Sequence, residues 1–355
     1  MIDSSPEALG WNEWFAAQAD RRRAGDDVAR VAAVDRDQLL LLGRPGLFRA
    51  RLSGKCLHES GDAERRPCVG DWVCVEKSDR DPTGIVHALL DRRTSLRRRS
   101  AGESVEVQMI AANVDVVLVV QSCHYDFNLK RLERYLVMVR DGGAEPVILL
   151  TKTDLVAPEA LAAQLEEIRR AGIAAPVMTL SNVTQEGVEE LRSALAPGRT
   201  YCFVGSSGVG KSTLINALTG RERLATREVS GTGEGRHTTV RRELVLLENG
   251  AMVIDNPGMR ELGLLGAEDG IEASYADILE LASQCRFRDC THANEPGCAV
   301  REGLESGRIG AEHYDNFVKV GKESEYSQLT YAEKRKKDRD FGRFIKAVKK
   351  DLEVE

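Results

Sequence analysis

The sequence predicts a multidomain chain with three parts of different fold class. These are a small all-β barrel, a central α/β domain with a mostly parallel sheet, and a C-terminal metal-binding and helical segment. Three observations predict this: short alternating apolar segments with glycines from residue 28 to 96, apolar runs alternating with helical patterns from 114, and a cysteine and histidine cluster near 285. We expect an N-terminal extension at 1–27, the barrel at 28–98, the α/β domain at 99–275 and the metal-binding segment with a basic helical tail at 276–355.

Length and composition exclude several classes of protein. The 355 residues exceed what one hydrophobic core usually serves, and 42% hydrophobic with 30% charged residues is the balance of a folded, soluble chain. The longest apolar stretches are far shorter than the roughly 20 residues that cross a bilayer, so no membrane partner is expected. The polar, acidic first residues lack the features of an export signal. We therefore expect a cytoplasmic protein, by default a monomer.

The cysteines suggest a bound metal, and the clustered basic residues suggest a polyanionic partner. Because thiols stay reduced in the cytoplasm, the 8 cysteines suggest metal binding before disulfides. The net charge of -6 hides basic runs at 21–23, 92–99 and 334–339. A charge run is usually a solvated face, but three runs at domain edges favour a polyanionic partner.

The N-terminal region shows two patterns. Apolar residues at near-helical spacing predict a short amphipathic helix within 7–20. Five or so strands in about 70 residues, one of them at 70–75, fit an OB-type barrel, a fold that commonly binds oligonucleotides.

The central region alternates strands and helices. Apolar runs at 114–120, 147–150 and 202–204 alternate with helical patterns at 128–140, 158–171 and 186–195. This βαβ alternation implies a parallel sheet covered by helices.

The strongest motif occupies residues 205–212. It reads Gly-Ser-Ser-Gly-Val-Gly-Lys-Ser, between an apolar strand pattern and a helical pattern, which is the context that a P-loop requires. Its glycines allow consecutive N–H groups to turn inward, and the lysine adds a mobile charge for the outer phosphates. The residues expected to hold a nucleotide are Gly205, Ser206, Ser207, Gly208, Val209, Gly210, Lys211, Ser212 and Thr213.

Two downstream segments resemble switch elements. A strand at 251–254 leads into Asp255, whose carboxylate can hold the Mg²⁺ shell, and Gly258 lets the next loop approach a third phosphate. The glycine-rich segment 231–239 ends in hydroxyls, including that of Thr238, which could close onto metal and phosphate. The expected Mg²⁺ ligands are Ser212, Thr238 and Asp255.

A third segment, residues 151–154, predicts which nucleotide base is bound. Residues 151–154 read Thr-Lys-Thr-Asp after an apolar strand, and resemble the Asn-Lys-x-Asp element of GTP-binding proteins. Asp154 can accept the ring N–H and the amino hydrogens of guanine, a donor pair that adenine lacks. Ser181 falls where a last base-supporting loop would lie. We expect Thr151, Lys152, Asp154 and Ser181 to contact the nucleotide, with GTP and GDP bound well ahead of ATP.

The order of these motifs is circularly permuted, because the base-reading element precedes the phosphate loop. This order, with the flanking barrel and the cysteine segment, resembles the ribosome small-subunit-dependent GTPase A family (RsgA/YjeQ) over roughly residues 28–300. The resemblance implies a GTP hydrolase, acting on an acid anhydride, that binds the small ribosomal subunit and its rRNA. It also implies action late in subunit maturation, with GTP hydrolysis to GDP and phosphate stimulated by the subunit. Thr151 departs from the Asn of many members, whose amide helps to tie the base loop to the phosphate loop.

The predicted catalytic group differs from that of Ras-type enzymes. Met259 stands where those enzymes have the glutamine that orients water, so the intrinsic rate should be low. His237 resembles the histidine of the family's Gly-x-His-Thr-Thr element and is the expected replacement, acting with Lys211 and Thr238. Arg236 and Arg260 could add charge stabilisation.

A metal site is predicted by the spacing Cys-x4-Cys-x-His-x5-Cys. Cys285, Cys290, His292 and Cys298 supply four ligands of the types that suit tetrahedral Zn²⁺, and a closed shell implies a structural role. We expect one structural zinc and, with GTP, Mg²⁺ as cofactors. The other five cysteines are expected to be small core residues.

Two other function classes stay open at this stage. A P-loop kinase would transfer phosphate to a small molecule, although no acceptor-binding lid is evident. The second is a non-ribosomal RNA-binding NTPase. A non-catalytic RNA-binding module with a decayed NTP site is disfavoured by the intact Lys211, Ser212 and Asp255.

Overall fold

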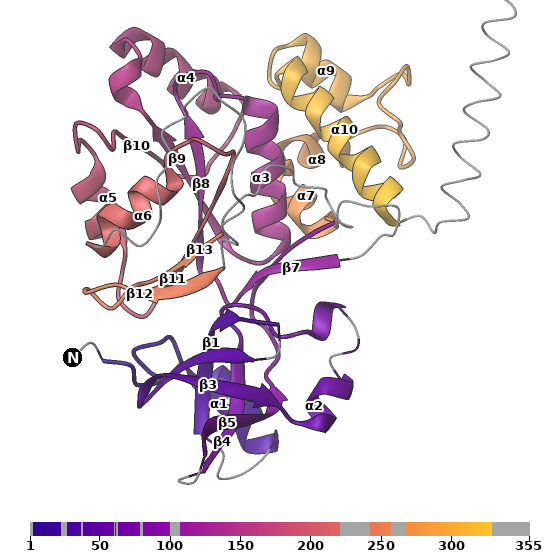
Figure 1. Ribbon diagram of the computed structural model, residues 1–355. Helices are drawn as coiled ribbons and strands as arrows, with labels where there is room; N and C mark the ends of the chain where they lie inside the picture. Colours follow the sequence, from indigo (N-terminus) through magenta and orange to yellow (C-terminus); the bar gives the residue numbers. More distant parts are fainter. Residues whose placement is uncertain are drawn as a thin grey trace, which may run out of the picture.

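The computed structural model describes residues 3–22, 27–36, 38–59, 61, 63–78, 81–99, 107–220, 242–256 and 267–328. They form a barrel, an α/β body and a set of C-terminal helices packed beside that body (Figure 1). None of the helices in the described ranges combines the length and the hydropathy of a membrane-spanning segment.

The barrel closes in the strand order β1-β2-β3-β5-β4. All its pairs are antiparallel except β3 with β5, which is parallel. Its interior is filled by small and branched side chains such as Ala29, Val31 and Val73, which are all fully buried. The expected OB-type barrel is confirmed. Its elements are β1 (Asp27–Val34), β2 (Leu39–Gly43), β3 (Gly46–Leu52), α2 (Gly54–Glu59), η1 (Ala63–Arg65), β4 (Trp72–Ser78) and β5 (Asp81–Leu89).

Helix α1 (Glu13–Arg22) packs against this barrel. The side chain of Asn12 accepts the N–H of Trp14 at 3.0 Å, so the helix begins there rather than at residue 7. The Trp11 and Phe15 rings lie 4.8 and 5.9 Å from the Trp72 ring on β4. The apolar face of the N-terminal helix is therefore buried on the protein's own barrel.

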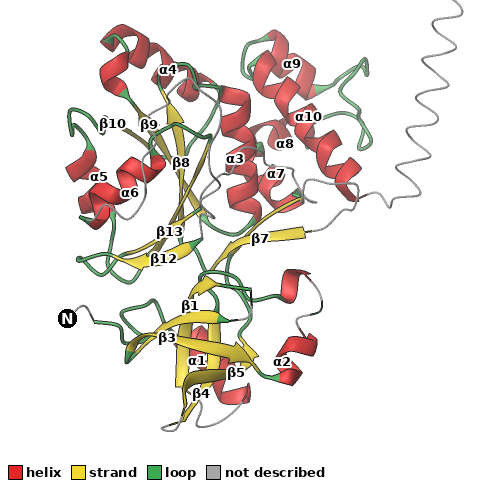
Figure 2. Cartoon of the chain, in the orientation of Figure 1, coloured by secondary structure: helices red, strands yellow, loops and turns green. Residues whose placement is uncertain are grey.

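A six-stranded sheet forms the α/β body, in the order β10-β9-β8-β11-β13-β12. Only the edge strand β12 runs antiparallel to its neighbour. Helices cover the sheet (Figure 2). The strands are β8 (Val116–Ser122), β9 (Glu145–Thr151), β10 (Val177–Leu180), β11 (Thr200–Gly205), β12 (Glu243–Leu246) and β13 (Met252–Asp255); the helices are α3 (Leu129–Asp141), α4 (Pro158–Arg170), α5 (Val188–Ala194) and α6 (Lys211–Thr219).

The central strands explain the apolar runs of the sequence. Every residue of β8 and of β11 is buried, as expected for parallel strands covered on both faces. The predicted strands at 114–120, 147–150 and 202–204, and the helices between them, lie within a few residues of the observed elements.

The basic run at 92–99 lies partly in a β-strand. Residues Ser95–Arg99 form β6, which pairs with β7 (Val107–Ala112) in a two-stranded ribbon. Arg97 forms ion pairs with Glu64 at 3.5 Å and with Asp141 at 3.4 Å. Part of this basic run is thus neutralised within the chain.

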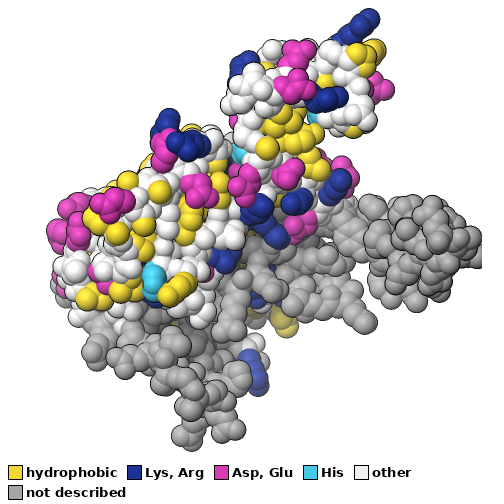
Figure 3. All heavy atoms as spheres, turned by 90° about the horizontal axis from the view of Figure 1, so that it is seen from above, with side chains coloured by type: hydrophobic (Ala, Val, Ile, Leu, Met, Phe, Trp, Pro, Cys, Tyr) yellow, Lys and Arg dark blue, Asp and Glu magenta, His cyan; other side chains and the backbone are white. Residues whose placement is uncertain are grey.

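Four C-terminal helices pack beside α3, chiefly through α7. Their bounds are α7 (Glu268–Ser274), α8 (Ala276–Ala282), α9 (Ala299–Glu305) and α10 (Ala311–Gln328). Figure 3 shows the face of the molecule that is seen from above in the orientation of Figure 1. On its described part, Lys and Arg side chains are interspersed with Asp and Glu. The charge of this face is therefore mixed.

A buried polar cluster joins these helices to the α/β body. His313 on α10 is 5% exposed, and its Nδ1 lies 2.6 Å from Glu133 of α3. Its Nε2 lies 3.3 Å from Asp277 of α8, and the Asn316 amide donates to the same Glu133 carboxylate. These three residues, which we call the Glu133–His313–Asp277 clasp, come from α3, α10 and α8 and therefore connect the three helices.

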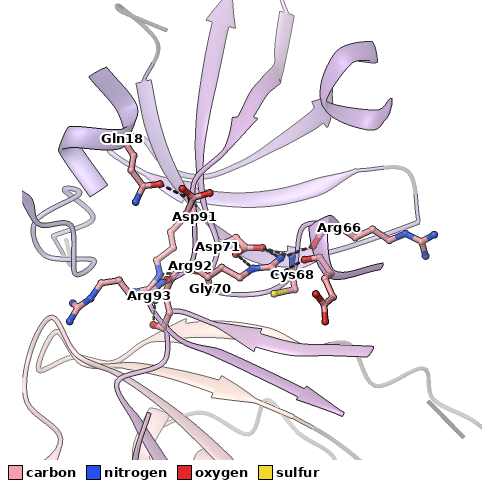
Figure 4. A network of polar contacts seen from close by, with 11 residues as sticks. Gln18, Arg66, Cys68, Gly70, Asp71, Asp91, Arg92 and Arg93 are labelled. Carbon is pink, nitrogen blue, oxygen red and sulfur yellow. Dashed lines mark hydrogen bonds and ion pairs between the residues drawn. The ribbon is translucent and has the colours of Figure 1, made fainter. Parts of the chain in front are cut away.

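A second polar network lies at the end of the barrel that faces the α/β body (Figure 4). The fully buried Asp71 carboxylate accepts Arg92 Nε at 2.7 Å and Arg92 Nη2 at 2.8 Å. It also accepts the Cys68 N–H at 2.7 Å, while Arg92 donates to the Arg66 carbonyl at 2.7 Å. Arg92 therefore serves the internal structure of the barrel.

Arg30 connects the barrel to the α/β body. The residue is 2% exposed, and its guanidinium donates to the carbonyls of Leu9 at 2.7 Å, Gly70 at 3.1 Å and Asn113 at 2.7 Å. Gly70 has φ +94, and a Cβ there would lie 2.0 Å from the Ala112 carbonyl, so only glycine fits this contact. The two parts are thus joined through backbone groups.

Candidate functional site

The P-loop connects strand β11 to helix α6. Its glycines at 205, 208 and 210 have φ of 145, 82 and 96°, a region that side chains disfavour. A Cβ on Gly205 would lie 2.2 Å from the Val120 carbonyl of β8, so the loop turns close against the neighbouring strand. The first helical residues, including Ser212 and Thr213, follow at the N-terminus of α6. Backbone N–H groups at such a terminus suit an anion.

Lys211 lies folded over this loop. Its side chain is 9% exposed, and Nζ donates to the carbonyls of Gly205 at 2.8 Å and Ser206 at 2.5 Å. Burial lowers the pKa of Lys211 to about 8, and the carboxylates of Asp255 and Asp126 oppose that shift. The cation is therefore held inside the loop that would receive phosphate.

Asp255 ends β13, the strand beside β11. It is 6% exposed, and burial raises the pKa of its carboxyl group while Lys211 and its hydrogen bond with the backbone of Asn256 lower it. The predicted metal-shell carboxylate thus lies within electrostatic reach of the P-loop lysine.

Two loops at the same sheet edge carry the predicted base contacts. Thr151 ends β9, Lys152 follows with φ 59°, and Asp154 lies in the short helix η2 (Thr153–Leu155). Ser181, after β10, donates its hydroxyl to the Asp154 carboxylate at 2.5 Å. Its Oγ also accepts the N–H groups of residues 183 and 184, each at 3.1 Å. The carboxylate is therefore oriented by a buried serine while Asp154 itself stays exposed.

Both base loops contact the P-loop. The Thr151 hydroxyl lies 2.7 Å from the Val209 carbonyl, and the Asn182 amide donates to the Gly210 carbonyl at 3.2 Å. The structure therefore brings the phosphate and base elements together, although their order in the chain is permuted. Asn182 and Asp126 were not among the predicted residues, because neither belongs to a recognisable motif.

Several predicted residues lie outside the described part of the chain. These are His237, Thr238, Gly258, Met259, Arg236 and Arg260, together with the basic run at 334–339. The roles assigned to them stay predictions, as do those of the described nucleotide contacts.

The cysteine and histidine cluster is assembled before α9. The ligand atoms of Cys285, Cys290, His292 and Cys298 all lie within 4.8 Å of one another. His292 Nδ1 is 3.4 Å from Cys298 Sγ and 3.6 Å from Cys285 Sγ, and the latter two sulfurs are 3.9 Å apart. Tetrahedral zinc with Zn–S bonds of about 2.3 Å requires ligand separations of about 3.5 to 3.8 Å. This group could bind one zinc ion.

The remaining cysteines are buried, as predicted. All five lie in the core without a disulfide: Cys56, Cys68, Cys74, Cys123 and Cys202. They are therefore small core residues and not further metal ligands.

Comparison with known proteins agrees with this geometry. The family model described as RsgA GTPase matches residues 89–265. The protein named small ribosomal subunit biogenesis GTPase RsgA in Opitutus terrae is 42% identical, with 90% of each chain covered. A relative in Lactiplantibacillus plantarum, named small ribosomal subunit biogenesis GTPase RsgA 2, is 40% identical, with 88% of each chain covered.

Solved structures show the same fold. YjeQ from Thermotoga maritima matches with a TM-score of 0.63 and 26% identity, over 84% of this chain and 98% of that one. YloQ, described as a circularly permuted GTPase, matches with a TM-score of 0.63 and 24% identity, over 87% and 98%. The fold is that of a circularly permuted GTPase with an N-terminal barrel and a C-terminal cysteine cluster, and the chain belongs to the RsgA family of small ribosomal subunit biogenesis GTPases.

Proposed function

We propose that this protein binds the maturing small ribosomal subunit and its rRNA, and hydrolyses GTP to GDP and phosphate when bound there. The observation that carries the proposal is the meeting of Lys211, Asp255 and the two base loops at one sheet edge, in a chain 42% identical to a named small-subunit GTPase. The same sequence similarity favours a ribosome-associated GTPase over a metabolic kinase.

The described residues have distinct roles in nucleotide binding. The P-loop amides and Lys211 hold the phosphates, and Lys211 leaves its two loop carbonyls to do so. Asp154, oriented by Ser181, accepts the guanine N–H groups and so selects against adenine. Mg²⁺ held by Ser212 and Asp255, together with Thr238 from outside the described ranges, would neutralise charge on the β and γ phosphates.

Hydrolysis depends on a group that orients water. Because Met259 cannot do so well, His237 is the proposed orienting residue, and its loop must close onto the nucleotide. The intrinsic rate is therefore low, and contact with the subunit raises it. This step is proposed from the sequence, since both residues lie outside the described ranges.

The zinc cluster has a structural role. With four protein ligands, a bound Zn²⁺ would have no open position for water, and it would stabilise a segment whose own core is small. Arg286 and Arg288, beside the ligands, would then present a rigid positive surface to RNA phosphates. The barrel supplies a second contact with rRNA. We propose a cytoplasmic monomer with GTP or GDP, one Zn²⁺ and Mg²⁺ bound.

The test is GTP turnover with and without purified small subunits. We expect strong stimulation by the subunit for the wild type, and nucleotide binding without stimulation for His237→Ala. No turnover under either condition, or transfer of phosphate to a metabolite, would exclude this function. An unchanged stimulated rate in the variant would remove only His237 from the mechanism.

A further inference from the structure

Asn182 makes a contact with the P-loop that no motif predicts. It follows Ser181 in the loop after β10, and its Nδ2 donates to the Gly210 carbonyl at 3.2 Å. A carbonyl only accepts hydrogen bonds, so the amide nitrogen must face it and Oδ1 must point elsewhere. This contact links residues 28 positions apart in the chain.

Thr151 alone cannot make all the contacts at this position. Its hydroxyl carries one proton but has two carbonyl acceptors within reach, that of Val209 at 2.7 Å and that of Gln121 at 3.2 Å. An asparagine amide in its place would offer two N–H groups. In this chain the two successive P-loop carbonyls, of Val209 and Gly210, are instead held from two different loops.

The Gly210 carbonyl, to which Asn182 donates, lies at the junction of the P-loop and helix α6. Gly210 caps α6 with φ 96° and directly precedes Lys211. Fixing its carbonyl fixes the peptide plane that carries the Lys211 N–H, one of the donors at the helix N-terminus. A Cβ on Gly210 would lie 2.7 Å from Asn182 Nδ2, so the two residues pack directly against each other.

The oxygen of the Asn182 side-chain amide shows which of its contacts is favourable. Asn182 Oδ1 is buried and has no hydrogen-bond partner among the described residues. A buried acceptor without a donor is unfavourable, and an apolar side chain would avoid it. The favourable contribution of the amide here is therefore its donation to Gly210.

We propose that Asn182 is a positioning residue for the nucleotide. With the Thr151 hydroxyl, its amide makes the connection between base loops and phosphate loop that one asparagine makes in many GTP-binding proteins. This inference rests on the proposed guanine nucleotide site. It assigns to Asn182 a role in affinity for both GTP and GDP, since each places phosphates in the same loop.

The test measures the affinity and dissociation rate of fluorescently labelled GDP and of a non-hydrolysable GTP analogue. The variants are Asn182→Ala, Thr151→Asn, the double variant, and Asn249→Ala as a matched control. Asn249 also donates its amide to a backbone carbonyl, that of Leu195 at 2.8 Å, but in the turn between β12 and β13. Circular dichroism verifies that each variant is folded.

We expect Asn182→Ala to weaken both nucleotides about fivefold to tenfold, mainly through faster dissociation, and Asn249→Ala to leave them unchanged. In the double variant, Asn at position 151 restores most of the lost affinity. Equal affinity of Asn182→Ala and the control, or no restoration in the double variant, would overturn the role of Asn182. Failure of the wild type to bind either nucleotide would instead overturn the proposed function.

Discussion

At the scale of single residues, we expect Lys211 to couple nucleotide binding to pH. Its pKa is lowered to about 8 by burial, so the free protein loses the lysine proton as the pH rises through that value. A bound triphosphate favours the charged form, and binding above pH 8 therefore requires uptake of a proton.

The affinity for GDP should fall about fourfold between pH 7 and about 8.5 in the wild type. The control is Lys211→Arg, whose guanidinium stays charged throughout, so its weaker binding should be independent of pH in this range. Calorimetric titration at several pH values measures both. A flat profile for the wild type would show that the lysine is fully charged before nucleotide arrives.

At the scale of elements, the zinc segment and α10 are held by different interactions. The segment from α8 to α9 is organised by the four ligands from 285 to 298, whereas α10 is held by the buried clasp of His313 with Glu133 and Asp277. We expect the first to be lost when metal is removed and the second to be lost by a change of protonation.

Loss of zinc should unfold the ligand segment without abolishing nucleotide binding. We expect one zinc per chain in the purified protein and less than half of that in Cys298→Ser. GDP affinity should change less than twofold, because the P-loop lies in another part of the fold. Cys74→Ala, a buried cysteine of the barrel, is the control and keeps its zinc. Elemental analysis that found full zinc in Cys298→Ser would remove this residue from the ligand set.

The clasp should make stability depend on pH. Burial lowers the pKa of His313, but its hydrogen bonds with Asp277 and Glu133 outweigh this and raise it to about 9, from 6.5 in the unfolded chain. The stabilisation is thus complete below pH 6.5 and is lost as the pH rises through about 9. Tyr275, whose ring lies 4.9 Å from the imidazole, faces the same cluster.

Between pH 6.5 and 9.5 the unfolding free energy of the wild type should fall by about 3 kcal/mol more than that of His313→Gln. Urea unfolding, followed by a probe on α10, measures the difference. Parallel pH profiles for the two proteins would mean that the histidine does not gain a proton on folding.

Elements were predictable from the sequence and long-range contacts were not. The runs at β8 and β11 and the P-loop glycines are local patterns, and each fixes its own strand or turn. His313 and Glu133 are 180 residues apart, and their meeting depends on how α10 packs on α3. No local pattern encodes that packing.

At the scale of the whole molecule, Arg30 joins parts that the sequence presents as separate. Its guanidinium touches the N-terminal turn, the barrel, the α/β body and, 222 residues away, the Met252 sulfur at 3.2 Å. Burial lowers its pKa to about 10, against the attraction of Asp115 and Asp71, so it remains charged at neutral pH. The sequence gives no sign of this, since one arginine in a strand resembles any other.

Arg30→Met should remove the guanidinium donors from the carbonyls of Leu9, Gly70 and Asn113, and cost roughly 3 kcal/mol of stability. The Gly70 carbonyl keeps one donor, the Asn113 side-chain amide at 3.1 Å. The amide of Ala112, which donates to the Val69 carbonyl across the junction at 2.9 Å, should then exchange faster with solvent. Arg49→Met is the control, because Arg49 lies on the outer face of the same barrel with 60% of its side chain exposed. Equal exchange at Ala112 in both variants would mean that Arg30 does not hold the parts together.

We propose that the phosphate-binding and base-binding elements, although permuted in the chain, form one guanine nucleotide site. Calorimetric titration of the purified chain with GDP and ADP in the presence of Mg²⁺ tests it most directly. We expect one GDP site per chain and at least about a hundredfold weaker binding of ADP, since adenine lacks the donor pair that we assign to Asp154. Equal affinity for the two nucleotides would contradict it.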